Sequence, residues 1–227
     1  MNTLALEWTL HRPAWRQRLH AYAAHLAQAC RAGAFADAET AGWDRTPAET
    51  LQDTAAMVRL VVPLPSSQAA NTALVSSVFE EPPELSGACA GALHSVSGPQ
   101  VGSAPQGVRL AAWHRDGRLA LPAHWAPNEA LTAWVDFAAP VSPRAQLAWR
   151  ANLDALEEVV AHGPFLGCEE NRYACIGASQ VHWLSPTRAQ YWIEACATPA
   201  PWIDLLCNLL FATHGPAPAM RVAMTTE

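Results

Sequence analysis

The sequence of 227 residues predicts an α+β protein, with a helical N-terminal half and a mostly antiparallel sheet with helices in the C-terminal half. The first observation is the alternation of apolar and polar side chains from Thr187 to Ala197, which is typical of a half-buried strand. The second is a series of apolar stripes at helical spacing, most of which begin near a proline or a capping residue and end before a glycine.

Residues 1–85 are interpreted as a helical region. Apolar side chains recur at helical spacing from Trp15 to Cys30, and Gly33 follows them as a stop signal. The segment 46–49, Thr-Pro-Ala-Glu, matches a capping box with proline at the first helical position. It predicts a second helix that runs from Thr46 to Val62.

Residues 86–107 mark a change in composition. This stretch holds five glycines and few large side chains, so it is interpreted as a loop or linker. Residues 108–227 then form an α+β region. One compact domain overall stays open as the alternative, because 227 residues suit either one large domain or two small ones.

The first strands of the α+β region are expected on either side of an Asp-Gly turn. Val108–Trp113 and Arg118–Leu121 flank residues 114–117, and Asp-Gly between apolar runs favours a hairpin. Leu131–Phe137 is either a strand or a short helix, and its periodicity does not decide between the two. Ser142-Pro143 is a start signal for the next helix.

The last part of the chain predicts strand, strand, helix and strand in that order. Tyr173–Leu184 is rich in aromatic and β-branched residues, and a turn at residues 185–187 leads into the strand Thr187–Ala197. Pro199–Thr213 is apolar nearly all round, which indicates a helix that is buried on more than one side. Met220–Thr225 is expected to return as a final strand.

Composition excludes several classes of function. The net charge of −6 argues against a nucleic acid as partner. All fourteen basic residues are arginines, which excludes Schiff-base lysine chemistry and a P-loop lysine. The most apolar helix is too short to span a membrane, so no membrane partner is expected. Without a signal peptide or a C-x-x-C pair, we expect a cytoplasmic protein whose six cysteines are reduced.

The densest set of potential metal ligands lies in one predicted loop and consists of His162, Cys168, Glu169, Glu170 and Cys175. A polar connection between helix and strand accounts for these residues without any chemistry. Structural zinc sites use closely spaced ligand pairs, which this set lacks, so no metal or other cofactor is expected in this chain. The alternative is a stand-alone thiol- or metal-dependent hydrolase with a site built from scattered cysteine, histidine and glutamate.

A candidate contact surface lies on the predicted strand from Thr187 to Ala197, whose polar face carries Arg188, Gln190, Trp192 and Glu194. Tryptophan and arginine are enriched at interface hot spots, so these four are the candidate partner- or peptide-binding residues. The alternative is that a second layer of the protein covers this face. An open edge of the sheet would also let an extended peptide add as a strand.

The order of these parts resembles that of the small partner subunit of methanobactin-type peptide-modifying iron oxidase complexes. The resemblance rests on helices at Trp15–Cys30 and Thr46–Val62, followed by strands around Val108–Trp113 and Tyr173–Ala197. It covers most of the chain but includes no diagnostic motif, so no functional residue is transferred to a position in this sequence.

The resemblance implies a non-catalytic subunit of a heteromeric oxidoreductase complex in natural product biosynthesis. This chain would recognise the leader of a short precursor peptide. A larger oxidase subunit would hold the iron and convert peptide cysteines to oxazolone and thioamide groups. The expected partners are therefore that oxidase subunit and the precursor peptide.

Overall fold

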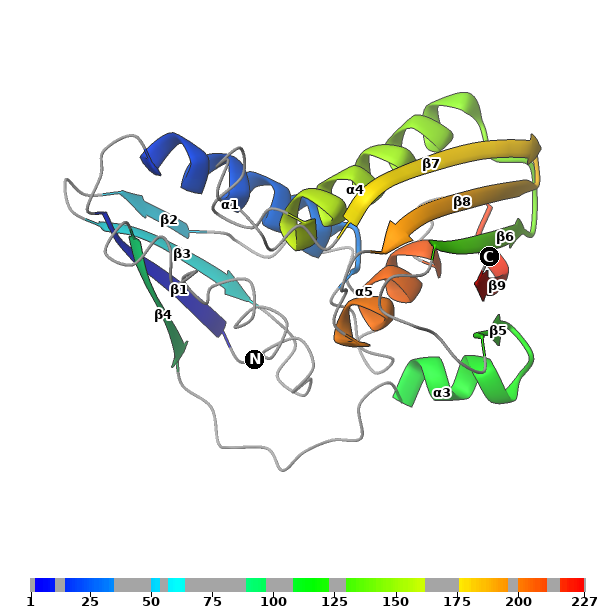
Figure 1. The fold of residues 1–227 in the computed structure, drawn as a ribbon, viewed down its shortest axis with the longest axis horizontal. Coiled ribbons are helices and arrows are strands. Elements are labelled where there is room, and N and C mark those ends of the chain that lie inside the picture. The colour runs from blue at the N-terminus through cyan, green and yellow to red at the C-terminus, as the bar shows by residue number, and fades with distance from the viewer. Residues whose placement is uncertain are drawn as a thin grey trace.

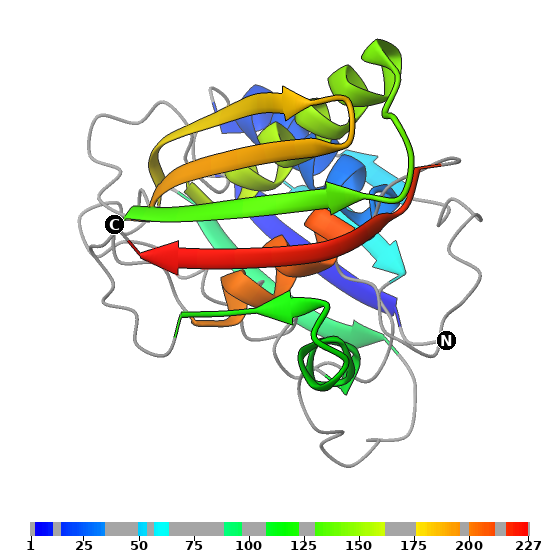
Figure 2. The same ribbon diagram turned by 90° about the vertical axis from the view of Figure 1, so that its right-hand side faces the viewer.

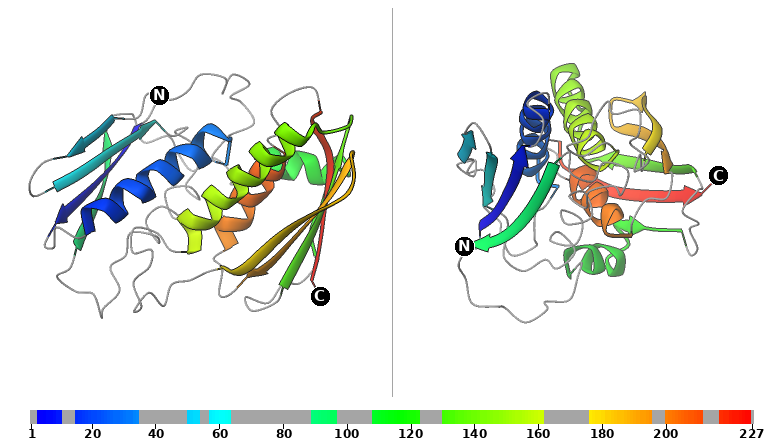
Figure 3. Two further views of the ribbon diagram at one scale, coloured as in Figure 1. Left: turned by 90° about the horizontal axis from the view of Figure 1, so that it is seen from above. Right: turned by 60° about the vertical axis from the view of Figure 1, so that its left-hand side comes forward.

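The computed structural model describes residues 3–10, 15–34, 50–53, 57–63, 89–96, 108–122, 130–161, 176–195, 200–211 and 217–226. Within these ranges two β-sheets stand at opposite ends of the molecule, with helices between them (Figure 1). The view from above in Figure 3 shows the helices as a layer between the two sheets. The expected α+β class is therefore confirmed.

The N-terminal sheet has four strands in the order β2-β3-β1-β4. The elements of this part are β1 (Thr3–Leu10), α1 (Trp15–Arg31), β2 (Thr50–Asp53), β3 (Met57–Pro63) and β4 (Cys89–Val96). All three strand pairings are antiparallel. Helix α1 confirms the first predicted helix, but the sheet was not predicted for this half of the chain.

The second predicted N-terminal helix, from Thr46 to Val62, is wrong. Thr50–Asp53 and Met57–Pro63 are strands that pair with each other, and the second of them also pairs with β1. The β-branched and apolar residues of Met57–Pro63 suit a strand, and pairing with a distant strand overrides the local helix signal.

The stretch 86–107, expected to be a loop or linker, also needs correction. Cys89–Val96 is a strand that pairs with β1 from Thr3 to Leu10. The prediction missed this strand because many of its residues are small, whereas strands are usually recognised by large β-branched and aromatic side chains. The N-terminal unit therefore extends at least to Val96.

The C-terminal sheet has five strands in the order β5-β9-β6-β8-β7. The elements of this part are α3 (Val108–Arg115), β5 (Leu119–Ala120), β6 (Ala130–Phe137), α4 (Pro143–Ala161), β7 (Ile176–Ser185), β8 (Arg188–Ala195), α5 (Ala200–Phe211) and β9 (Ala219–Thr226). Strand β5 pairs with β9 in parallel, and the other three pairings are antiparallel. The expected mostly antiparallel C-terminal sheet is confirmed.

The two sheets share one topology. The unit β6-α4-β7-β8-α5-β9 places its four strands in the order β9-β6-β8-β7, which is the ferredoxin-like arrangement. In the N-terminal sheet the order β4-β1-β3-β2 repeats this pattern strand for strand. No repeat is visible in the sequence, so the duplication is one of backbone arrangement.

The last four predicted elements, β7, β8, α5 and β9, are confirmed, and so is the helix that begins at Pro143. Ser142 caps this helix, because its Oγ accepts a hydrogen bond from the Ala145 amide at 3.3 Å. Leu131–Phe137, which the sequence left open, is part of strand β6.

The hairpin expected around Asp116-Gly117 is wrong, since Val108–Arg115 is helix α3 and β5 pairs with β9 instead. Gly117 has a φ of 70° and ends the helix. The Arg118 amide donates to the Trp113 carbonyl at 2.8 Å, and the Gly117 amide donates to the His114 carbonyl at 3.1 Å. This is a Schellman motif, so the Asp-Gly signal marks a helix end here.

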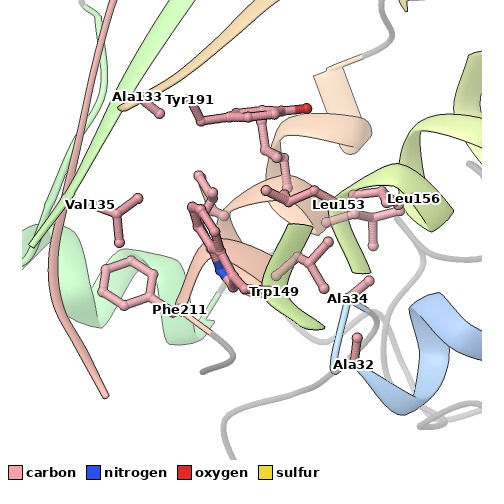
Figure 4. Close-up of a cluster of buried hydrophobic side chains, with 14 of the residues drawn as sticks. Ala32, Ala34, Ala133, Val135, Trp149, Leu153, Leu156, Tyr191 and Phe211 are labelled. Atoms are coloured by element: carbon pink, nitrogen blue, oxygen red, sulfur yellow. The ribbon is translucent and has the colours of Figure 1, made fainter. Parts of the chain in front are cut away.

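The helices of the two units share one core. Helix α1 packs against α4, and Figure 4 shows Ala32 and Ala34, just after α1, close to Leu153 and Leu156 of α4. Both leucines are buried. Asn208 of α5 is also buried, and its Nδ2 donates to the Ala34 carbonyl at 3.1 Å. The two halves are therefore joined by apolar packing and by a buried hydrogen bond.

The C-terminal sheet presents one face to the helices. Val135, Tyr191 and Val222, from three neighbouring strands, are fully buried on this inner face. The other face is turned toward the viewer in Figure 2, with helices α1, α4 and α5 behind the sheet and α3 below it. The sheet therefore has an inner face that belongs to the core and an outer face that the described helices leave open.

Candidate peptide-binding groove

Strand β7 forms one edge of the C-terminal sheet. Among the described strands it has a single neighbour, β8, so the backbone groups on its other side have no strand partner. Its ten residues, Ile176–Ser185, include no Lys, Arg, Asp, Glu or Pro. Native proteins protect sheet edges with such residues or with very short strands, as at the opposite edge, where β5 has two residues. The β7 edge lacks these protections.

The middle of β7 is regular. Residues Ser179–Trp183 pair with Ile193–Ala189 without interruption, and irregularities in the register lie on both sides of this stretch. In a regular strand every second residue directs its N–H and C=O groups outward, and an added strand pairs with this repeating pattern. The regular stretch is thus the part of the edge that is suited to further pairing.

A groove of about 630 Å³ runs between this stretch and helix α4. We call it the β7–α4 groove; its lining consists of Pro143, Gln146, Leu147 and Arg150 from α4 and Ser179–Trp183 from β7. The β7 side of the lining coincides with the regular stretch of the strand. An unpaired edge and a flanking helix therefore meet in one concave site.

One end of the groove is apolar. Pro143, Leu147 and Trp183 lie there, and the Leu147 side chain is 73% exposed. Large apolar side chains left in water at a concave site favour a ligand that covers them.

The floor of this apolar end is a cluster of three aromatic rings. The ring centroids of Phe137 and Trp183 lie 5.4 Å apart in a stacked arrangement. Trp149 of α4 meets both rings edge-on, at 5.8 Å from Phe137 and 5.7 Å from Trp183. Aromatic pairs in these geometries stabilise one another, so Trp183 is held in place beneath the groove.

The other end of the groove is polar and is organised by Arg150. The Arg150 Nη2 atom lies 2.6 Å from Asp154 Oδ1, 3.9 Å from Glu157 Oε2 and 3.2 Å from Ser179 Oγ. These contacts tie α4 to β7 at this end. Arg150 remains 31% exposed in its side chain, so part of the guanidinium faces the groove.

Tyr191 supports this arrangement from inside the core. Its hydroxyl donates to Glu157 Oε1 at 2.7 Å, and the tyrosine itself is fully buried. Burial, together with the negative charge of Glu157 and the hydrogen bond to it, raises the pKa of Tyr191 well above 10.0. Tyr191 is therefore a neutral donor that orients Glu157. Within the described ranges, no three His, Cys, Asp or Glu side chains are placed to hold a metal ion.

The predicted contact residues Arg188, Gln190, Trp192 and Glu194 lie on the outer face of β8. Arg188 and Glu194 are exposed, whereas Gln190 and Trp192 are half-buried, and the alternate residues Ala189, Tyr191 and Ile193 are buried. The predicted register of this strand is thus confirmed. None of the four lines the β7–α4 groove, and their role in binding a partner stays a prediction.

The outer face of β8 and its neighbour β6 carries both charged and aromatic side chains. Trp134 of β6 lies opposite Gln190, and Asp136 lies opposite Arg188. The Arg188 Nε atom is 3.4 Å from Asp136 Oδ1. Opposite charges and two half-buried tryptophans on one sheet face are compatible with a protein contact surface.

Trp192→Ala should reveal whether this outer face binds a partner. Because Trp192 is only half-buried, we expect a loss of unfolding free energy below the roughly 3–5 kcal/mol of a core tryptophan. If it is a central contact, affinity for the partner should fall about 30-fold, which corresponds to about 2 kcal/mol. Thermal unfolding and a binding titration with the partner measure the two effects. Unchanged affinity would remove Trp192 from the interface.

The other residues that were considered for chemistry lie mostly in a part of the chain that the structure does not describe. His162, Cys168 and Cys175 lie outside the described residues. Cys207 of α5 is fully buried, which suits a small apolar core residue. Sequence reasoning missed the groove itself. The available signal was the uncharged strand Ile176–Ser185, but strand order is needed to recognise it as an edge.

Comparison of the chain with protein-family models, with curated proteins and with solved structures found no match. The ferredoxin-like topology is shared by proteins of many functions, so function must be argued from the site. Within the described ranges, no helix combines the length and the apolar character needed to cross a membrane.

Proposed function

We propose that this protein is a non-catalytic peptide-recognition subunit that binds an extended peptide along β7. The observation that carries the proposal is the uncharged outer edge of β7, which no other described strand pairs with, beside the β7–α4 groove. An extended segment placed there would extend the sheet by one strand. Its alternate side chains would point toward α4 and toward the outer face.

Strand addition accounts for both affinity and selectivity at such a site. Main-chain hydrogen bonds between the peptide and Ser179–Trp183 would hold any extended sequence. Selectivity would come from the side chains of α4 that line the groove, with Leu147 and Arg150 at different ends. The fixed aromatic floor reduces the ordering cost of binding, since Trp183 is already packed before the peptide arrives.

The finer form of the proposal is that the peptide is the leader of a precursor whose cysteines are oxidised by a larger, iron-containing partner subunit in the cytoplasm. This form rests on the family resemblance. Two of the four parts that carried the resemblance, the helix Thr46–Val62 and the strand Val108–Trp113, are replaced by strands and a helix respectively. Helix α1 and the strands β7 and β8 continue to support it.

Leu147→Gln is expected to lower affinity for groove-binding peptides at least about tenfold, because it removes exposed apolar surface from the lining. Linear peptides selected from a display library on the immobilised full chain would be synthesised and titrated by calorimetry. Stability should change by no more than about 0.5 kcal/mol, since Leu147 is 73% exposed. Met220→Gln, at a 51% exposed residue of β9, is the matched control and should bind as the parent does.

The contribution of main-chain hydrogen bonds to peptide affinity can be tested by changing the peptide alone. N-methylation of alternate peptide amides removes donors without changing any protein residue, and one of the two alternating patterns should abolish binding. If both N-methylated peptides still bind, or if Leu147→Gln leaves peptide affinity unchanged, strand addition at β7 is wrong. A leader segment encoded beside an iron oxidase gene, titrated in the same way, tests the finer form.

A further inference from the structure

We infer that the β7–α4 groove selects a five-residue extended segment with a large apolar side chain at one end and a neutral hydrogen-bond acceptor, such as Asn or Gln, at the other. This inference rests on the proposed function and assigns the chemistry of its ligand. It follows from three features of the groove, which are its length, its apolar end and the Arg150 guanidinium at its polar end.

The length follows from the pairing register. Five residues, Ser179–Trp183, are regular, so an added strand can pair with five residues before the register changes. Ser179, Val181 and Trp183 belong to the inner side of the strand, because they pair with Ile193, Tyr191 and Ala189, all buried. Ligand residues opposite these three share the side that faces α4.

The direction of α4 relative to β7 assigns an environment to each of these three ligand positions. Arg150 bonds to Ser179, and the start of the helix at Pro143 therefore lies toward Trp183. The ligand residue opposite Trp183 meets the apolar end of the groove. The ligand residue opposite Ser179 meets Arg150. The two positions are four residues apart along the ligand, with one inward residue between them.

The apolar position is defined by surface that is otherwise exposed. Leu147 is one of the four large hydrophobic side chains that are exposed among the described residues. It lines the groove together with Trp183. A ligand leucine or phenylalanine here would cover Leu147, whereas a small polar side chain would leave it in water.

The acceptor position is defined by the donors of Arg150. Its contacts with Asp154, Glu157 and Ser179 all fall on Nη2. The Arg150 side chain is 31% exposed and lines the groove, so a ligand can reach its guanidinium. A guanidinium presents five N–H donors in a fixed fork, so it can donate to a ligand oxygen as well as to these side chains.

The charge around Arg150 favours a neutral acceptor over a carboxylate. Asp154 and Glu157 already place two carboxylates near this guanidinium. A ligand Asp or Glu would add a third negative charge close to the first two, and the chain as a whole carries a net charge of −6. A carbonyl oxygen of Asn or Gln accepts the same hydrogen bonds without that repulsion.

A defined peptide panel tests the inference on the full chain. The parent carries the core Leu-Ser-Val-Ser-Gln between flexible Gly-Ser ends, and its reversed sequence covers the other strand direction. In the better-binding direction, Leu→Ser and Gln→Glu should each weaken affinity about tenfold, and Gln→Ala about fivefold. The readout is a calorimetric titration at low salt.

Arg150→Lys supplies the matching change in the protein. It keeps the positive charge beside Asp154 but removes the donors that reach the ligand, so the advantage of Gln over Ala should shrink to less than about twofold. The preference for Leu over Ser should persist in this variant. The peptide panel is titrated against the parent protein and tests the inference without Arg150→Lys. A folding defect in this variant would therefore leave the test intact.

The possible results separate the inference from the proposed function. Equal binding of all panel members, with sensitivity to N-methylation, would overturn the selectivity and leave strand addition intact. A preference for Glu over Gln would overturn the neutral acceptor. Absence of binding by any extended peptide, in the panel or in the display selection, would overturn the proposed function itself.

Discussion

Replacing Trp149 with alanine is expected to lower the free energy of unfolding by about 3–5 kcal/mol. The residue is only 4% exposed, and its ring contacts those of Phe137 and Trp183. Removing the indole leaves a cavity between α4 and the inner face of the sheet, and the surrounding rings fill it only in part. Urea unfolding followed by circular dichroism would measure the loss.

Trp149→Phe is the matched variant. The indole Nε1 is buried and has no hydrogen-bond partner among the described residues, so phenylalanine keeps much of the aromatic volume and loses none of the described hydrogen bonds. We expect a cost below about 1.5 kcal/mol, because removal of an unpaired buried donor offsets part of the lost packing. A phenylalanine variant as unstable as the alanine variant would show that the indole N–H is bonded in solution.

Tyr191→Phe should cost about 1.5–3 kcal/mol, the usual range for a hydrogen bond to a charged group. The variant leaves Glu157 without the donor that now lies 2.7 Å from its Oε1 atom. The ring stays in place, so the effect is separate from core packing. The measurement is again urea unfolding, and a loss below about 0.5 kcal/mol would mean that water replaces the hydroxyl.

The same substitution should change the dependence of stability on pH. The pKa of Tyr191 is raised in the folded state, so folding favours the protonated form. Its contribution is fully present below the usual tyrosine pKa of about 10 and is lost as pH rises toward the folded value. The parent should therefore lose stability above about pH 10 more steeply than Tyr191→Phe. Parallel alkaline unfolding curves for the two proteins would contradict this.

The elements that could be predicted from the sequence are those whose signals are local. Strand β8 alternates between fully buried residues and residues that are exposed or half-buried, and α4 begins at a serine cap followed by proline. The errors arise where a local signal has two structural meanings. Asp116-Gly117 suits a hairpin turn as well as a Schellman motif, and Met57–Pro63 becomes a strand because β1 pairs with it.

The candidate groove depends on information that is not local. That β7 is an edge strand follows from the order of the whole sheet, and that α4 lies beside it follows from packing. The polar face of β8 could be assigned from periodicity alone, and the structure confirms that assignment. The face or edge that is suited to a ligand could not be assigned in this way. The exposure of side chains such as Leu147 is known only after the chain has folded.

The shared strand order of the two sheets has a consequence for the origin of the molecule. Helices α1 and α4 occupy equivalent places, each after the first strand of its unit, and they pack against each other. Contact between equivalent elements is what a two-fold symmetric dimer produces. The chain has the arrangement that gene duplication and fusion of such a dimer would leave. The equivalent edges of the two sheets differ, because β2 is short and ends in Asp53 whereas β7 is long and carries no charged residue.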